Sequence, residues 1–271
     1  MDKSHSVFRT IVALLLLAAT VFVCFSLGNW QLDRAAQRDA ISLSMRLGRQ
    51  LPAQALTART QADELVAWRP AGARGYWRHE LTVLLENRNH DGRPGFWVAT
   101  PLVLEGSPDT ALLVLRGWLP RPLQSSERMP DIEQADGPLT VRGELRERVP
   151  RLLEIWSWSE KTDSLPAKLP APEQRLPRIQ NLDIADYARA TGLKFLPAVL
   201  AMQAAHDAEQ SPTDAALIKD WPEPSLDSDK NRGYALQWFG FAGIAAIAWL
   251  IVAWRALRRA RRNKSLGKDP L

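Results

Sequence analysis

The chain has 271 residues, of which 35 are basic and 30 acidic, so its formal net charge is +5 at pH 7. This length allows one or two domains with a sizeable core, and 46% apolar against 24% charged residues excludes a disordered or collagen-like chain. The single cysteine, Cys24, excludes an intramolecular disulfide and a cysteine-based zinc site.

The first predicted element is an apolar run over 10–28 that contains no charged residue. The run is as long as a helix that crosses a bilayer, about 20 residues at 1.5 Å each. The alternative is a cleaved signal peptide, but residues 24–30 lack an A-x-A site, and Val23 before Cys24 fits a lipoprotein site poorly. We therefore expect an uncleaved transmembrane helix after a cytoplasmic segment 1–9, with Cys24 packed rather than reactive.

The following segment, 30–50, is rich in Ala, Leu, Arg and Gln and contains no proline. This composition predicts that the first transmembrane helix continues into the aqueous phase and ends before Pro52. The segment opens a domain, 29–233, that is predicted to be β-rich with some helix.

Short apolar and β-branched runs separated by turn residues predict the strands of this domain. The predicted strands are 78–86, 96–104, 111–118, 139–146 and 195–203, with turn clusters at 90–95 and 107–109. Pro101 is expected to put the end of its strand at a sheet edge or a bulge. Short strands joined by short turns favour an antiparallel sheet or a small barrel.

One short helix is predicted over 183–191. Asp183 is its expected cap, Asp186 completes a capping-box pattern, and Gly192 ends it. The proline-rich segment 160–178 is expected to be a loop, and the acidic segment 207–229, which also contains prolines, an extended strap that leads to a second apolar run.

The second apolar run, 234–254, is also uncharged, and tryptophans near its ends are typical of anchoring at membrane interfaces. The tail 255–271 holds seven basic residues against one acidic residue, whereas 30–254 has a small acidic excess. The positive-inside rule therefore predicts that both termini are cytoplasmic and that the domain 29–233 lies on the opposite side.

The nine residues before the first run are too few for a mitochondrial transit peptide, which favours a bacterial inner membrane with a periplasmic domain. The basic tail has an alternative interpretation, the binding of nucleic acid or ribosomes. Because the tail directly follows a span, anchoring to lipid headgroups is the favoured interpretation, and no nucleic-acid partner is expected.

Motifs that carry catalysis are missing from the sequence. It has no G-x-S-x-G elbow, P-loop or G-x-G-x-x-G, and no charged residue within the two spans that would mark an ion path. The histidines are far apart along the chain and show no metal-ligand spacing, although a fold could gather the last three; they are His5, His79, His90 and His206. We therefore predict no enzyme, no catalytic residue and no metal site.

Aromatic and polar residues gather where each apolar run meets the domain, at 30–34 and at 231–239. Anchoring at the interface explains Trp and Tyr there. The alternative is a shared site for a flat amphipathic ligand or a partner helix. The candidate binding residues are Trp30, Arg34, Tyr234, Gln237 and Trp238.

These clusters carry a resemblance to the surfeit locus protein 1 family of cytochrome c oxidase assembly factors. Residues 27–34 resemble the family's L-G-x-W-Q-L-x-R, 95–102 its G-x-x-V-x-T-P-L, and 116–120 its R-G-W-V-P; 141–146 and 234–239 match as well. The matches follow the family's order between two spans, so the chain resembles a bacterial member.

The resemblance implies a non-enzymatic factor that aids haem a insertion into, or stabilisation of, cytochrome c oxidase subunit I or its assembly intermediates. A His usually precedes the family's Y-A-x-x-W-F motif by three residues, but this chain has Asn231 there. Asparagine is a poor axial ligand for haem iron. The alternative is therefore a membrane-anchored scaffold that binds an oxidase subunit without any cofactor.

Two interpretations remain for the arginines and for the 116–120 motif. Arg34 and Arg116 could each meet a haem propionate or pair with acids of the domain. Within the motif, Gly117 is expected to permit a close approach, Trp118 to fill the core and Pro120 to end a strand.

Overall fold

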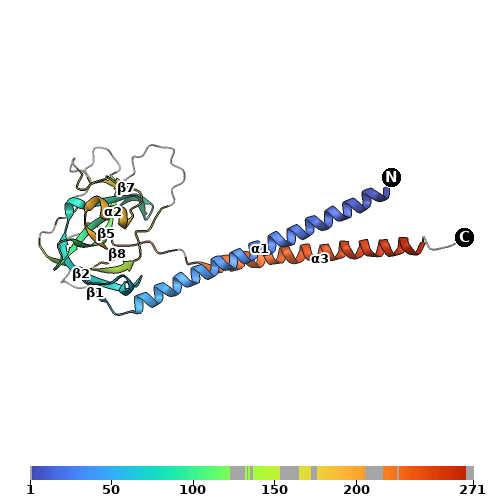
Figure 1. Ribbon diagram of the computed structural model, residues 1–271, viewed down its shortest axis with the longest axis horizontal. Helices are drawn as coiled ribbons and strands as arrows, with labels where there is room; N and C mark the ends of the chain where they lie inside the picture. Colours follow the sequence, from blue (N-terminus) through green and yellow to red (C-terminus); the bar gives the residue numbers. More distant parts are fainter. Residues whose placement is uncertain are drawn as a thin grey trace. The chain divides into compact units, whose positions relative to one another are not determined.

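The computed structural model describes residues 2–122, 132, 134, 137–152, 165–171, 176–204, 216–224 and 226–266. The chain forms two compact units, one made of Met1–Leu43 and Pro224–Leu271 and the other of Ser44–Glu223. The first unit contains one long helix and most of the other, orange-red and blue in Figure 1, and the second unit contains the last residues of the blue helix and all strands.

The two long helices are α1 (Asp2–Gln50) and α3 (Ser228–Leu266). Both are long and apolar enough to cross a membrane, over Val7–Gln50 and Ser228–Arg262. Helix α1 continues without a break through the predicted aqueous segment and ends two residues before Pro52, as predicted. Helix α3 is longer than the second apolar run, because it includes the basic residues beyond that run.

Helices α1 and α3 pack against each other in antiparallel directions. The Phe25 and Phe239 rings are 5.6 Å apart, and Arg232 Nη2 pairs with Asp39 Oδ2 at 2.5 Å. As residue numbers rise on α1, those of their partners fall on α3. A Cβ on Gly28 would lie 2.5 Å from the Phe239 ring, so a glycine there permits this close approach.

The second unit is a small five-stranded barrel with additional strands, which confirms one of the two predicted architectures. The sheet order is β1-β2-β6-β8-β5-β4-β3-β7, and a further pairing of β2 with β4 closes the ring. The strands are β1 (Gln54–Leu56), β2 (Pro70–Trp77), β3 (Val83–His90), β4 (Arg93–Leu104), β5 (Thr110–Pro120), β6 (Leu139–Arg146), β7 (Arg178–Ile179) and β8 (Lys194–Met202).

The barrel is not wholly antiparallel, because β5 and β8 run parallel. Parallel neighbours need a crossover connection, and here the chain passes through α2 (Ile184–Thr191) before it forms β8. Asp183 caps α2 as predicted, since its Oδ1 accepts a hydrogen bond from the Ala185 amide at 2.9 Å, and Gly192 ends it at φ +74°. Asp186 makes no capping box and pairs instead with Arg189.

Three local predictions were wrong in their boundaries. The strand expected over 78–86 begins at Val83, because residues 79–81 form the 3₁₀ turn η2. The turn expected over 90–95 is confined to Asp91 and Gly92, both at positive φ. Pro101 lies inside β4, where β4 changes partner from β3 to β2. Its carbonyl accepts from Arg78 in that gap, so its missing N–H removes no ladder bond.

The remaining predicted strands, β5, β6 and β8, lie within one or two residues of their expected limits. The described parts of the predicted loop 160–178 form neither helix nor strand before β7, and residues 160–164 and 172–175 lie outside the described residues. Of the predicted strap, residues 207–215 and 225 lie outside them, and 216–224 forms neither helix nor strand, with Ile218 bridging Trp118. Its last two residues, 228–229, are wrong as strap, because α3 begins at Ser228.

Apolar side chains fill both faces of the central strands. Along β4, β5 and β8, residues of two buried clusters alternate. The first cluster includes Leu102, Val114 and Leu200. The second cluster, with Leu113 and Val199, packs against Tyr187 of α2. Strands covered on both faces read as continuous apolar runs, which is why these strands were recognisable in the sequence.

Candidate functional site

The helix pair brings the two aromatic and polar clusters of the sequence together. Asn231 Nδ2 donates a hydrogen bond to Gln31 Oε1 at 2.7 Å, across 200 residues of sequence. Ala35 and Ala235 are buried on either side of this bond, and such small side chains let the two backbones approach. The position of the family's His is therefore part of the contact between α1 and α3.

Helical geometry assigns the candidate residues to one side of this contact. At 100° per residue, Phe25 and Asp39 lie on the flank of α1 opposite to Trp30 and Arg34. Their partners on α3 are Phe239 and Arg232. These two residues likewise lie on the flank of α3 opposite to Tyr234 and Gln237. Because Phe25 and Asp39 contact their partners on one flank of the pair, four of the five candidate residues lie together on the other flank. We call this flank, with Trp30, Arg34, Tyr234 and Gln237, the Trp30 face.

The Trp30 face is open and mixes aromatic, cationic and amide groups. Trp30 is 53% exposed and Tyr234 54% exposed. The Arg34 guanidinium lies 6.0 Å from the centre of the Trp30 ring, and Gln237 is exposed. Trp238 is half-buried nearer the contact line, with its ring 6.0 Å from that of Phe241. This arrangement suits a flat or helical partner with polar groups at one end.

The histidines do not supply a metal site in the part of the chain that the structure describes. His79 Nδ1 is 3.5 Å from Arg116 Nη1, while the His90 ring packs 5.2 Å from that of Trp118 and lies near Asp220. His206 lies outside the described residues, as does the side chain of His5. Among described residues no three His, Cys, Asp or Glu side chains converge. That the chain has no metal site stays a prediction.

The motif at 116–120 has the structural roles expected for three of its residues. Trp118 is buried, Pro120 ends β5, and a Cβ on Gly117 would lie 2.6 Å from Leu217. Arg116 is fully buried in the barrel unit, 4.9 Å from the centre of the Trp77 ring, so it offers no charge to an external ligand. Of the two arginines considered for a carboxylate ligand, Arg34 is the exposed one.

A charged cluster that the sequence did not reveal lies within the second unit, beside the last residues of α1 and β6. We call it the Arg49 cluster: Arg49, Trp68, Glu144, Arg146 and Glu223. Arg49 donates to buried Glu144 at 2.8 Å and to Glu223 at 2.7 Å, and these bonds, the one to Glu144 foremost, raise the pKa of Arg49. Arg146 stacks 3.7 Å from the Trp68 ring centre, and burial lowers its pKa. One guanidinium thus joins the start and the end of the barrel unit.

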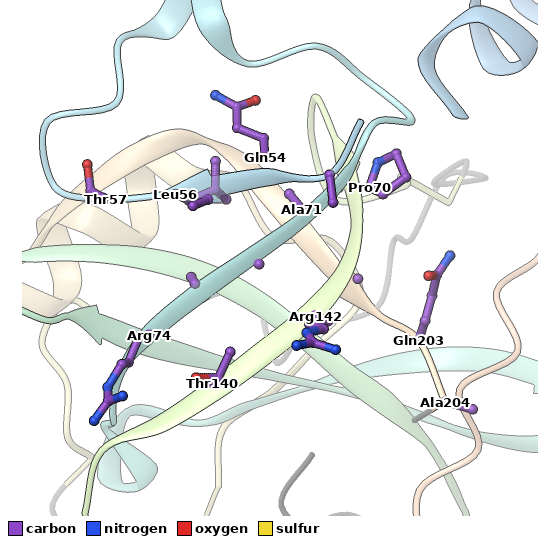
Figure 2. Close-up of a pocket in the computed structure, with 15 residues that line it drawn as sticks. Gln54, Leu56, Thr57, Pro70, Ala71, Arg74, Thr140, Arg142, Gln203 and Ala204 are labelled. Carbon is purple, nitrogen blue, oxygen red and sulfur yellow. The ribbon is translucent and has the colours of Figure 1, made fainter. Parts of the chain in front are cut away.

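A groove of about 580 Å³ lies over β1, β2 and β6 (Figure 2). The small residues Ala71, Gly72 and Ala73 of β2 are part of its lining. Arg74 and Arg142 extend from β2 and β6, as Figure 2 shows. Arg74 forms an ion pair with Glu105 at 3.3 Å. The described lining contains neither a His nor a carboxylate, so the groove offers no acid–base pair for catalysis.

Comparison with known proteins matches most of the chain to one family. The model of the SURF1 family matches residues 18–243, which run from within α1 to within α3 and include the whole barrel. Uncharacterised SURF1-like proteins of Mycobacterium tuberculosis and Mycobacterium bovis are 25% identical to this chain over 261 residues, covering 94% of this chain and 88% of theirs. The chain belongs to the SURF1 family.

Proposed function

We propose that the protein is a non-enzymatic, membrane-anchored assembly factor of a haem–copper cytochrome c oxidase, and that it acts on subunit I or on its assembly intermediates. Membership of the SURF1 family and two helices long and apolar enough to cross a membrane support this proposal. The observation that carries it is the Trp30 face, on a helix pair that the Asn231–Gln31 hydrogen bond and the Phe25–Phe239 and Asp39–Arg232 contacts hold together.

We further propose that both helices cross a bacterial inner membrane, with the barrel in the periplasm and both chain ends in the cytoplasm. The distribution of charge supports this orientation, since α3 continues past its apolar run into a segment with five arginines. The exposed apolar side chains of both helices, such as Leu15 and Ile247, suit contact with lipid. The lipid bilayer is thus the second partner.

The Trp30 face contains no histidine, and Asn231 in the adjacent helix contact does not fit direct ligation of haem iron. Asn231 offers an amide in place of an imidazole, and that amide is already hydrogen-bonded to Gln31. This pairing favours the scaffold form of the function, in which the face binds a transmembrane helix of the oxidase subunit. The alternative form, contact with haem a, is supported by the combination of aromatic rings with the Arg34 cation.

Co-purification from membranes tests the proposal. Deletion of the gene is expected to lower the amount of assembled oxidase, and the tagged protein is expected to retain subunit I. Trp30→Ala with Tyr234→Ala is expected to lose subunit I, because both removed rings are exposed on the Trp30 face. Tyr76→Ala is the matched control, since Tyr76 is an exposed aromatic residue of β2. Equal retention by both variants would contradict the proposal.

An absorption spectrum separates the two forms of the function. The wild-type protein, co-expressed with haem a synthesis, is expected to be colourless after purification, while Asn231→His gains a haem spectrum because it introduces an imidazole. A stoichiometric haem spectrum in the wild type would refute the scaffold form and leave haem contact as the function.

A further inference from the structure

The end of α3 beyond its apolar run is strongly basic. Five of the eight residues from Arg255 to Arg262 are arginine, and all five side chains are exposed. No aspartate or glutamate occurs between Lys230 and Leu266, so every charged residue of this stretch is basic. An exposed cationic surface of this kind is complementary to an anionic partner.

Four of these arginines share one side of the helix. Arg255, Arg258, Arg259 and Arg262 follow one another at intervals of three, one and three residues, which places them within one arc at 100° per residue. Along the axis they extend over about 10 Å, at 1.5 Å per residue. The headgroup layer of one leaflet is about 5–8 Å thick, and the long arginine side chains cover the remaining few ångströms, so all four guanidinium groups can reach a single layer.

A stacking contact fixes the level of this layer along α3. The Arg258 guanidinium lies 3.8 Å from the centre of the exposed Trp254 ring, so the arginine side chain extends back toward the apolar run. Tryptophan at the end of a span lies at the level of the lipid headgroups. The contact therefore places a guanidinium at the level of the lipid phosphates.

We propose that Arg255, Arg258, Arg259 and Arg262 form a binding surface for the phosphates of anionic phospholipids, which we call the arginine face. The proposal rests on the membrane insertion proposed above and adds a lipid class to it. Guanidinium groups bind phosphate oxygens bidentately, and a lipid with net negative charge carries no competing cationic headgroup. Each arginine near an anionic surface contributes about a fivefold preference.

Spin-labelled lipids test the proposal on the full-length protein in vesicles of about four parts phosphatidylcholine to one part phosphatidylglycerol. We expect wild type to associate with labelled phosphatidylglycerol at least about fivefold more strongly than with labelled phosphatidylcholine. Replacing all four arginines of the face by Gln should abolish this preference. The control replaces four exposed arginines of the barrel unit by Gln and should keep it; these are Arg59, Arg74, Arg93 and Arg189.

Two results would overturn the proposal: a wild type without lipid preference, or a four-Gln variant that keeps it. Alkaline carbonate extraction of the same vesicles distinguishes the causes of failure. Wild-type protein that is extracted is not inserted, which refutes the membrane anchoring as well. Protein that resists extraction but shows no preference refutes only the arginine face.

Discussion

The buried carboxylate of Glu144 provides the sharpest test of the energetics of the barrel unit. Glu144 is 4% exposed, and its Oε2 accepts from Arg49 Nε at 2.8 Å. Its Oε1 lies 2.8 Å from Arg146 Nη2 without hydrogen-bond geometry, so that contact is ionic. Glu144→Gln keeps the shape of the side chain and removes the charge that compensates two guanidinium groups.

The expected cost follows from which arginine can recover water. Removing one member of a buried ion pair costs about 3–5 kcal/mol. The Arg49 side chain is 40% exposed and regains hydration, whereas that of Arg146 is 12% exposed and keeps an uncompensated charge. We therefore expect about 3 kcal/mol, at the lower end of that range. For a unit of this size that corresponds to a fall in Tm of about 6–12 °C.

The assay is thermal unfolding of the full chain in detergent, followed by tryptophan fluorescence. Glu223→Gln is the matched control, because it removes the same charge from the same Arg49 at a side chain that is 55% exposed. Exposed pairs contribute about 0–1 kcal/mol, so the control should shift the Tm by less than about 4 °C. Equal shifts for both variants would refute the argument that burial of Glu144 makes the contact strong.

Three further predictions follow from buried groups and one close approach. Tyr187→Phe should cost about 1–2 kcal/mol at pH 7 by urea unfolding. Burial raises the pKa of Tyr187 above its usual value near 10, so above that pH only the unfolded state ionises, wild-type stability falls, and the variant's deficit shrinks. Burial lowers the pKa of Arg88 to about 10, so above pH 10 the folded state releases this proton before the unfolded state does, and the contribution of Arg88 to the free energy of unfolding rises with pH. Arg88→Met lacks this gain, so its loss of stability at alkaline pH should be steeper. Gly28→Val should disrupt the contact with Phe239 and lower cysteine cross-linking between α1 and α3, whereas Gly243→Val, whose Cβ meets nothing, should not.

The geometry of the helix pair has a consequence for the proposed recognition of an oxidase subunit. The Trp30 face depends on the register of α1 against α3, to which the Asn231–Gln31 bond and the Phe25–Phe239 and Asp39–Arg232 contacts contribute. A one-residue rotation of either helix turns its half of the face by 100°. Variants that weaken the helix contact should therefore lose the partner even when every residue of the face is intact.

Local signals in the sequence were sufficient for the helices and for most strands. The two apolar runs are recognisable by length alone, and Asp183 and Gly192 mark the ends of α2 through interactions within a few residues. Strands β5, β6 and β8 were found because apolar residues are contiguous or alternate in them. The limits of β3 and β4 were misplaced because residues typical of turns are part of these strands. Where a strand ends there is decided by pairing with the neighbouring strand rather than by composition.

The sequence by itself determined three features: two helices long and apolar enough to cross a membrane, the β-rich class, and the motifs that relate the chain to its family. All three depend on residues close together in the chain. Only the tertiary structure decided the closure of the barrel by β2 and β4, the parallel pairing of β5 with β8, and the burial of Glu144 beside Arg49. The same holds for the Trp30 face, which depends on a contact across 200 residues. Hydrophobic periodicity specifies which side of an element is buried, but the partner that buries it is selected by the packing of the whole chain.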